Sequence, residues 1–335
     1  MIVCKSKIKR RIMVDDDFIY FLILNGYSQQ NNGLMYGKMG TAISLFQLSR
    51  YLKGKKIEDH AYEMTNQVFA SCVQCDSFDN GRIGLAWALA YLINNQYAEI
   101  DYHEVYGKEH DIIMKTISCY IPNKDNIHQS FDYLIFLLTV VPNISRHSVG
   151  TKIVDKILAT LCSYSEDIIN DSIEEFYLIS TKIIGLSNIC RFVNLDKCAE
   201  KIVSKFKEEY DNYVCNNLTF LVELLNYGIR CHTVNTVLLA TDLIDTFFKN
   251  LLIVSIDYKT AVDILYNIKR LSKSLGINRY QNIKILIEEL IYNKNSFLYQ
   301  IDWKTLGSLK GGLTRFIWNE VGSIQNSAEN IIMLL

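Results

Sequence analysis

The chain has 335 residues, of which 49% are hydrophobic, and its 35 basic and 36 acidic residues leave a formal net charge of -1. This balance is unlike that of a nucleic-acid-binding protein, which needs a basic face to replace the counterions of the phosphates. Only 2 residues are proline, so long helices are permitted, because proline removes a backbone donor and breaks helices. We therefore expect a large apolar core and no nucleic-acid partner.

The N-terminal segment, residues 1–14, holds a basic cluster that Asp15, Asp16 and Asp17 offset at once. We expect this segment to be solvated and flexible, and the acidic triplet to begin a helix. The segment does not resemble a secretory signal, because no apolar core or small-residue cleavage site follows the basic residues. The longest apolar stretch is far shorter than the ~20 residues that cross a bilayer. Nine cysteines in a long chain also fit reduced thiols better than a disulfide framework. The sequence thus predicts a cytoplasmic protein without a membrane span.

Apolar residues recur at helical spacing along the whole chain, which places them on one face of each helix. The clearest stripes fall within residues 57–72, 153–162, 199–210 and 264–275. Short segments rich in Asn, Asp, Gly and Ser separate the helices, as helix connections usually do. These breaks lie at residues 25–33, 53–56, 76–81, 95–101, 121–127, 141–146, 163–171, 194–196, 275–278 and 292–296. They predict about 12 to 14 helices of ordinary length and no sheet. No linker separates regions of different amino-acid composition, so we expect one domain over residues 1–335.

Glycine pairs open several segments that are apolar on nearly every side. The clear copies are Gly37–Gly40 and Gly81–Gly84, and the looser ones are residues 307–312 and Gly185-Leu186. A helix that is apolar all round must be buried all round, and glycine at its start lets another backbone approach closely. We therefore expect the helices that open at Gly40, Gly84 and Gly312 to form an inner ring, with Trp87 and Leu89 buried. Amphipathic helices such as residues 57–72 would form an outer ring around it.

The residues around these glycines resemble a known family. Residues 33–40 (Gly-Leu-Met-Tyr-Gly-Lys-Met-Gly), followed by Arg50, look like the first inner-helix motif of lanthionine synthetase C-like proteins. The similarity is greatest to the variant found beside bacterial peptide-maturation genes. Residues 78–85 resemble the second glycine motif of that family and residues 309–313 its last one. The resemblance implies an all-α fold, an α/α toroid of helical hairpins. It also implies zinc chemistry, since cyclases of the family use zinc to activate a peptide Cys thiol that adds to a dehydrated Ser or Thr.

The chain departs from the family pattern at the zinc ligands, which are a Cys in a Trp-Cys-x-Gly-like motif and a later Cys-His-Gly segment. The only Cys-His pair here is Cys231-His232, and Thr233 follows it in place of glycine. The earlier cysteine at a suitable distance is Cys190, which lacks the neighbouring Trp and Gly. If zinc were bound, these three side chains with an open fourth position would be its ligands. Because both motifs are degenerate, we expect no ordered zinc and no other cofactor.

In a toroid of this kind, the loops before the inner helices surround the mouth of a central cavity. Helix N-termini carry partial positive charge and unpaired N–H donors, and lysine or arginine beside them adds charge of the same sign. We hypothesise that the mouth binds an acidic or extended peptide segment. The residues that would bind it are Tyr36, Lys38, Asp79, Asn80, Arg82 and Lys310.

Three functions remain open at this stage. The one we expect is a lanthionine synthetase C-like protein in ribosomal peptide modification, which lacks catalytic zinc and binds a peptide or a maturation protein. The second is a divergent zinc-dependent thioether cyclase that uses Cys190, Cys231 and His232. The third is a toroid enzyme that acts on a glycan or another small substrate, since such enzymes place two carboxylates across a cleft lined with aromatics.

Overall fold

The computed structural model describes residues 16–71, 73–141, 148–169, 171–190, 192–209, 215–252, 256–276, 279–292 and 317. Over these residues the chain forms thirteen α-helices and one short 3-10 helix, with no strands. The predicted all-α class is therefore confirmed. In chain order the elements are α1 (Asp16–Ser28), α2 (Lys38–Leu52), α3 (Lys55–Phe69), α4 (Arg82–Asn94), α5 (Tyr102–Ser118), η1 (Lys124–Asn126), α6 (Ile127–Thr139), α7 (Ser148–Ile168), α8 (Ile173–Ile189), α9 (Val193–Glu209), α10 (Leu218–Arg230), α11 (Val234–Asn250), α12 (Tyr258–Leu275) and α13 (Gln281–Tyr292).

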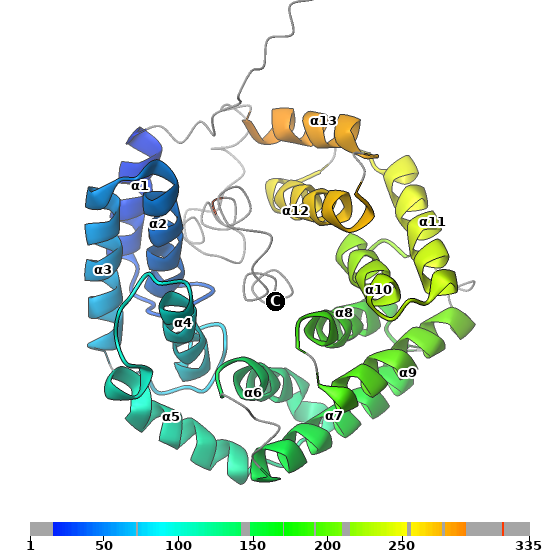
Figure 1. The fold of residues 1–335 in the computed structure, drawn as a ribbon, viewed down its shortest axis with the longest axis horizontal. Helices are drawn as coiled ribbons and strands as arrows, with labels where there is room; N and C mark the ends of the chain where they lie inside the picture. Colours follow the sequence, from blue (N-terminus) through cyan, green and yellow to red (C-terminus); the bar gives the residue numbers. More distant parts are fainter. Residues whose placement is uncertain are drawn as a thin grey trace, which may run out of the picture.

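The helices alternate between two layers along a curved path (Figure 1). The inner layer consists of α2, α4, α6, α8, α10 and α12, and the outer layer of α3, α5, α7, α9, α11 and α13. Each inner helix packs against the outer helix that follows it in the chain, and α1 packs against α2 and α3. The curved path is built from helical hairpins, with the polar connections between them.

Burial explains why α4 lies inside. Its sequence, Arg82-Ile-Gly-Leu-Ala-Trp-Ala-Leu-Ala-Tyr-Leu-Ile-Asn, is apolar on every face, so a helix with one solvated side would expose several large side chains. Trp87 is 3% exposed and Leu89 is fully buried, as predicted. The α2 helix is also buried on every side, because every residue from Met39 to Ser49 is buried. The helices predicted to open near Gly40 and Gly84 are therefore the inner helices α2 and α4.

The outer helices bury one stripe each. In α3 the buried stripe is Ile57, Ala61, Met64 and Val68, and in α9 it includes Ala199, Ile202 and Phe206. Their other faces carry charged side chains, in keeping with the amphipathic pattern. No helix within the described ranges is long and apolar enough to cross a membrane.

Several local predictions differ from the structure. The expected break at 25–33 begins too early, because α1 continues to Ser28. The expected break at 163–171 begins too early, because α7 continues to Ile168 and buried Ser165 donates its hydroxyl to the Cys162 carbonyl at 2.8 Å. The expected break at 194–196 falls in the first turn of α9, where Asp196 suits the positive helix end. Gly185 lies inside α8 and opens no helix. The predictions for residues 1–14, Cys72, Lys310 and the glycines of 307–312 fall outside the described residues.

Neighbouring inner helices run parallel where side-chain pairs connect them directly. Gln47 donates to the Tyr91 hydroxyl at 3.0 Å, and Arg50 donates to the Asn95 carbonyl at 2.8 Å. The sequence separations of these pairs are 44 and 45. A nearly constant separation means that both helices advance in the same direction, so α2 and α4 begin at the same end of the fold.

Candidate functional site

The loops that precede α2 and α4 meet at the N-terminal ends of these two helices. The Asn31 amide donates to the Asn80 side-chain oxygen at 2.9 Å. The backbone N–H of Met35 donates to the Asp79 carbonyl at 2.8 Å. These bonds join residues 29–37 and 73–81 into one surface, which we call the glycine-loop surface. The structure thus brings together predicted site residues from two separate segments of the chain.

The glycines of this surface are required by close backbone contacts. A Cβ on Gly33 would overlap the backbone of Asn80, and a Cβ on Gly84 would overlap the carbonyl oxygen of Phe78. A Cβ on Gly81 would overlap backbone atoms of Cys75 and Ser77. Real side chains do not approach backbone so closely, so the glycines have a structural role whether or not the surface binds a ligand.

The glycine-loop surface carries an exposed aromatic ring, Tyr36, and a half-buried lysine, Lys38. The Tyr36 side chain is 36% exposed, and Lys38 is half-buried. The Lys38 ammonium donates to the Gln67 side-chain oxygen at 3.0 Å, and among the described residues no carboxylate pairs with it. Within the described part of the chain, no carboxylate thus balances the positive charge of Lys38 in the first turn of α2, where the helix end adds partial positive charge.

Arg82 differs from the expectation of a solvated cation beside the mouth. Its side chain is 15% exposed, and Nε donates to Asp76 Oδ1 at 2.6 Å. Glu109 lies 3.6 Å from Nη1. Burial alone would lower the pKa of Arg82, but the hydrogen bond and charge of Asp76, aided by Glu109, raise it overall. Two carboxylates thus compensate this guanidinium, and it adds little net charge to the glycine-loop surface.

A pocket of about 360 Å³ lies beside Arg82, between the end of α3, the start of α4 and the start of α5. Its walls combine apolar side chains such as Phe69 and Leu85 with the polar groups of His103, Glu104 and Lys108. Tyr106 closes one side, where its hydroxyl donates to the Arg82 carbonyl at 3.0 Å. Arg82 therefore faces this outer pocket and the acidic groups around it. Of the predicted residues, Tyr36, Lys38, Asp79 and Asn80 are not among the groups that line it.

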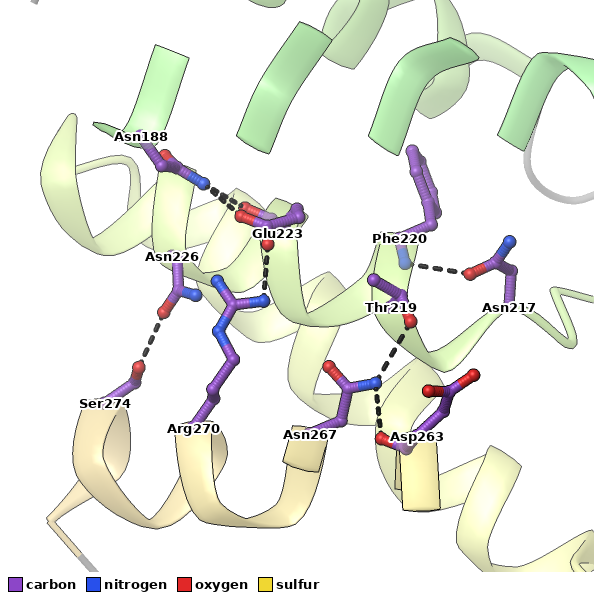
Figure 2. Close-up of polar contacts among 10 residues, drawn as sticks. All are labelled: Asn188, Asn217, Thr219, Phe220, Glu223, Asn226, Asp263, Asn267, Arg270 and Ser274. Carbon is purple, nitrogen blue, oxygen red and sulfur yellow. Dashed lines mark hydrogen bonds and ion pairs between the residues drawn. The ribbon is translucent and has the colours of Figure 1, made fainter. Parts of the chain in front are cut away.

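A second polar feature, which the sequence did not predict, lies between α8, α10 and α12 (Figure 2). Glu223 of α10 is 1% exposed and accepts from Arg270 Nη1 of α12 at 2.5 Å. Asn188 of α8 donates to the second Glu223 carboxylate oxygen at 2.8 Å. Burial alone would lower the pKa of Arg270, but the charge of Glu223 raises it overall. The group holds a full ion pair in the interior, with one residue from each of three inner helices.

Two further pairs extend this contact along α10 and α12. Asn267 donates to the Thr219 hydroxyl at 3.0 Å, and Ser274 donates to the Asn226 side-chain oxygen at 2.6 Å (Figure 2). The three pairs between α10 and α12 have sequence separations of 48, 47 and 48, so these helices also run parallel. We call the three pairs the polar ladder. It fixes the relative position of two inner helices.

One signal in the sequence points to the polar ladder. Glu223 is the only charged residue in the run Phe220-Leu-Val-Glu-Leu-Leu225. A carboxylate in a helix face that is otherwise apolar needs a buried partner, because burying an isolated charge is costly. The adjacent glutamates at 174–175, 208–209 and 288–289 are easier to notice in the sequence. The buried carboxylate of Glu223, by contrast, has only apolar residues on either side of it.

The three residues considered as zinc ligands do not form a ligand group. Cys190 ends α8 and Cys231 ends α10. Phe176 and Phe220 are in contact near the starts of α8 and α10, and Ser187 and Arg230 are in contact near their ends. The two helices therefore run parallel, and the two cysteines lie at the same end of the fold. Cys190 is half-buried, and burial raises the pKa of its thiol to about 11, whereas Cys231 and His232 are exposed. Among the described residues, no three His, Cys, Asp or Glu side chains gather as a group that could hold a metal ion.

Comparisons of the chain with protein-family models, with curated proteins and with solved structures found no match. The resemblance to lanthionine synthetase C-like proteins therefore stays a prediction that depends on the glycine segments.

Proposed function

We propose that the chain is a lanthionine synthetase C-like α/α toroid that acts in ribosomal peptide modification by binding a peptide or a maturation protein. The observation that carries the proposal is the junction of the two glycine loops at the N-terminal ends of α2 and α4. This junction places an exposed aromatic ring and a lysine on one surface at the partly positive start of α2, where the backbone N–H groups of Lys38 and Gly40 already donate to loop carbonyls. Those are groups that bind an extended acidic chain.

The toroid part of the proposal rests on the alternation of inner and outer helices. Six hairpins, from α2–α3 to α12–α13, follow one curved path, and the helices α2 and α4, which are buried on nearly every side, lie on its inner side (Figure 1). The third glycine motif at 307–312 and Lys310, which the sequence predicts for a further inner helix and for the mouth, lie outside the described residues.

The partner surface that we propose is centred on Lys38 and Tyr36. Lys38 has no carboxylate partner among the described residues, so an acidic group can reach it without displacing an ion pair. Arg82 is already compensated by Asp76 and Glu109, so its role is to hold the loop that carries Asp79 and Asn80. The charge that selects an acidic partner would come from Lys38 and from the end of α2.

The test is a binding measurement with two labelled extended peptides of equal length, one rich in Glu and one rich in Lys. We expect the acidic peptide to bind and Lys38→Glu to weaken its binding about fivefold to tenfold at low salt. The difference should shrink as salt rises, because salt screens exposed charges. Lys156→Glu is the matched control, since Lys156 is an exposed lysine on the outer helix α7. Equal binding by wild type and Lys38→Glu at every salt concentration would exclude this surface.

A further inference from the structure

The outer pocket between α3, α4 and α5 meets the glycine-loop surface at the end of α3. The Lys38 ammonium donates to the Gln67 side-chain oxygen at 3.0 Å, and the Asn32 amide donates to the Ser71 hydroxyl at 2.8 Å. The backbone N–H of Ser71 donates to the Val68 carbonyl at 3.1 Å, so the chain still turns as a helix there. Gln67 and Ser71 are four residues apart and therefore lie on one side of this helix end. Because Ser71 also lines the outer pocket, it forms the border between the pocket and the glycine-loop surface.

The wall of the outer pocket on the side of the core is apolar and aromatic. Val68 and Leu85 line it and are buried. Phe69 and Tyr106 also line it, and their rings pack edge to face with centroids 5.8 Å apart and planes at 78°. A third ring that enters the pocket can add to this pair, because aromatic rings gain from such contacts beyond the burial of their area. The volume of about 360 Å³ is near the small end of the roughly 300–1,000 Å³ of ligand pockets, which suits one ring better than a large cofactor.

The charged groups of the outer pocket favour a neutral ligand group. Arg82 is paired with Asp76 and Glu109, so a charged ligand group would have to compete with this ion pair. Glu104 and Lys108 are exposed, line the pocket and have opposite signs, so together they attract neither a cation nor an anion strongly. A neutral ring gains the apolar contacts of the wall and leaves the ion pair intact.

We propose that the outer pocket binds an aromatic side chain of the same peptide whose acidic residue contacts Lys38. This inference rests on the proposed function and names the class of peptide. The two contact points lie beside Gln67 and Ser71, and four residues of helix cover about 6 Å. An extended chain covers about 6.6 Å in two residues and points the side chains of residues i and i+2 to the same side. The peptide therefore carries a Glu or Asp two residues away from a Phe, Tyr or Trp.

The experiment measures the binding of labelled extended peptides of equal length to the full chain at low salt. The first peptides hold Glu two residues from Phe, in either order along the chain. Three kinds of control peptide replace Phe by Ala, replace Glu by Gln, or place Phe directly beside Glu. We expect one order of Glu and Phe to bind about tenfold more tightly than its Ala control, because the ring leaves water. Placing Phe beside Glu should lose most of this gain, because the ring then points to the opposite side of the extended chain.

The variant Gly107→Leu tests the pocket from the side of the protein. Gly107 lines the pocket, and a Cβ there would meet only the His103 side chain, at ordinary distances of 3.7 and 3.9 Å. Leucine in place of glycine favours α5 as a helix and narrows the pocket. We expect the tenfold advantage of Phe over Ala to shrink below about twofold, with binding of the Ala peptide unchanged. Lys115→Leu is the matched control, because Lys115 is exposed on α5 and does not line the pocket.

The outcomes separate this inference from the proposed function. Equal binding of the Phe and Ala peptides to the unmodified chain would overturn the pocket assignment, and the proposed function would stand if the Gln peptide still bound more weakly than the Glu peptide. Equal binding of the Glu and Gln peptides would overturn the acidic contact at Lys38 and, with it, both proposals as stated. No binding by any peptide would also overturn both. The peptide series needs no variant, so a failure of Gly107→Leu to fold, checked by circular dichroism, does not decide the result.

Discussion

The ion pair between Glu223 and Arg270 gives the sharpest test of the packing of the inner helices. The change is Glu223→Gln, which keeps the size of the side chain and removes its charge. Arg270 is 8% exposed at its side chain and pairs with no other carboxylate in the polar ladder. The substitution therefore leaves a buried guanidinium opposite a neutral amide.

The magnitude follows from what the substitution leaves behind. Removing one partner of a buried ion pair typically costs about 3–5 kcal/mol, because the remaining charge is desolvated without compensation. A glutamine amide can still accept one hydrogen bond from Arg270, which retains a small part of the interaction. Its NH2 group would face the donor of Asn188, which now bonds the carboxylate at 2.8 Å, so that bond is lost as well. We therefore expect the free energy of unfolding to fall by about 3 kcal/mol.

Equilibrium unfolding in urea, followed by the helical circular dichroism signal, measures this change. The matched control is the double variant Glu223→Leu with Arg270→Met, in which both charges are removed and the volume is kept. Apolar replacement of a whole buried pair is often neutral or stabilising, so the double variant should be more stable than Glu223→Gln. If Glu223→Gln unfolds at the urea concentration of wild type, the carboxylate is solvated and the buried ladder is wrong.

Two further predictions concern the glycine contacts and the metal. Gly84→Ala should lower the free energy of unfolding by about 1–3 kcal/mol, because the new methyl group overlaps the Phe78 carbonyl. The control is Gly107→Ala, whose Cβ would meet only ordinary contacts and which should stabilise α5 slightly. Equal effects of the two substitutions in urea unfolding would contradict the packing role of Gly84. Protein purified without a metal-binding tag should hold less than one zinc per chain by elemental analysis, and Cys231→Ser should leave that content unchanged; one zinc per chain that this variant loses would instead support the cyclase alternative.

The class of fold could be predicted from the sequence because it depends on properties of single helices. The all-round apolar face of α4 leaves burial inside as its only stable position, and the one-sided stripe of α3 leaves it half-solvated. The ends of helices were less predictable. Residues 163–168 look like a polar connection, yet Ser165 bonds to the carbonyl one turn back and stays in α7. Serine can satisfy its hydroxyl within a helix, so a polar run by itself does not end one.

The candidate site was partly predictable for a related reason. A glycine motif marks where two backbones approach, and the contacts of Gly33 with Asn80 and of Gly84 with Phe78 occur where the motif indicates them. The direction of a charged side chain depends on partners that are distant in the sequence. Arg82 turns toward Asp76, six residues earlier, and toward Glu109 on α5, and no spacing within the motif specifies either contact.

The pairing of Arg82 with Asp76 and Glu109 limits which peptides the proposed glycine-loop surface could select. With both Lys38 and Arg82 free, the surface would attract any acidic chain through two separated charges. With Arg82 compensated, the selectivity of the proposed surface would depend on one lysine and on the end of α2, which act over a short range because salt screens exposed charges beyond about 10 Å. A single charge gives weak binding unless apolar contacts add to it, and Tyr36 is the exposed ring in position to supply them. If the surface binds a peptide as proposed, the segment that fits it best would carry an acidic residue close to an apolar one.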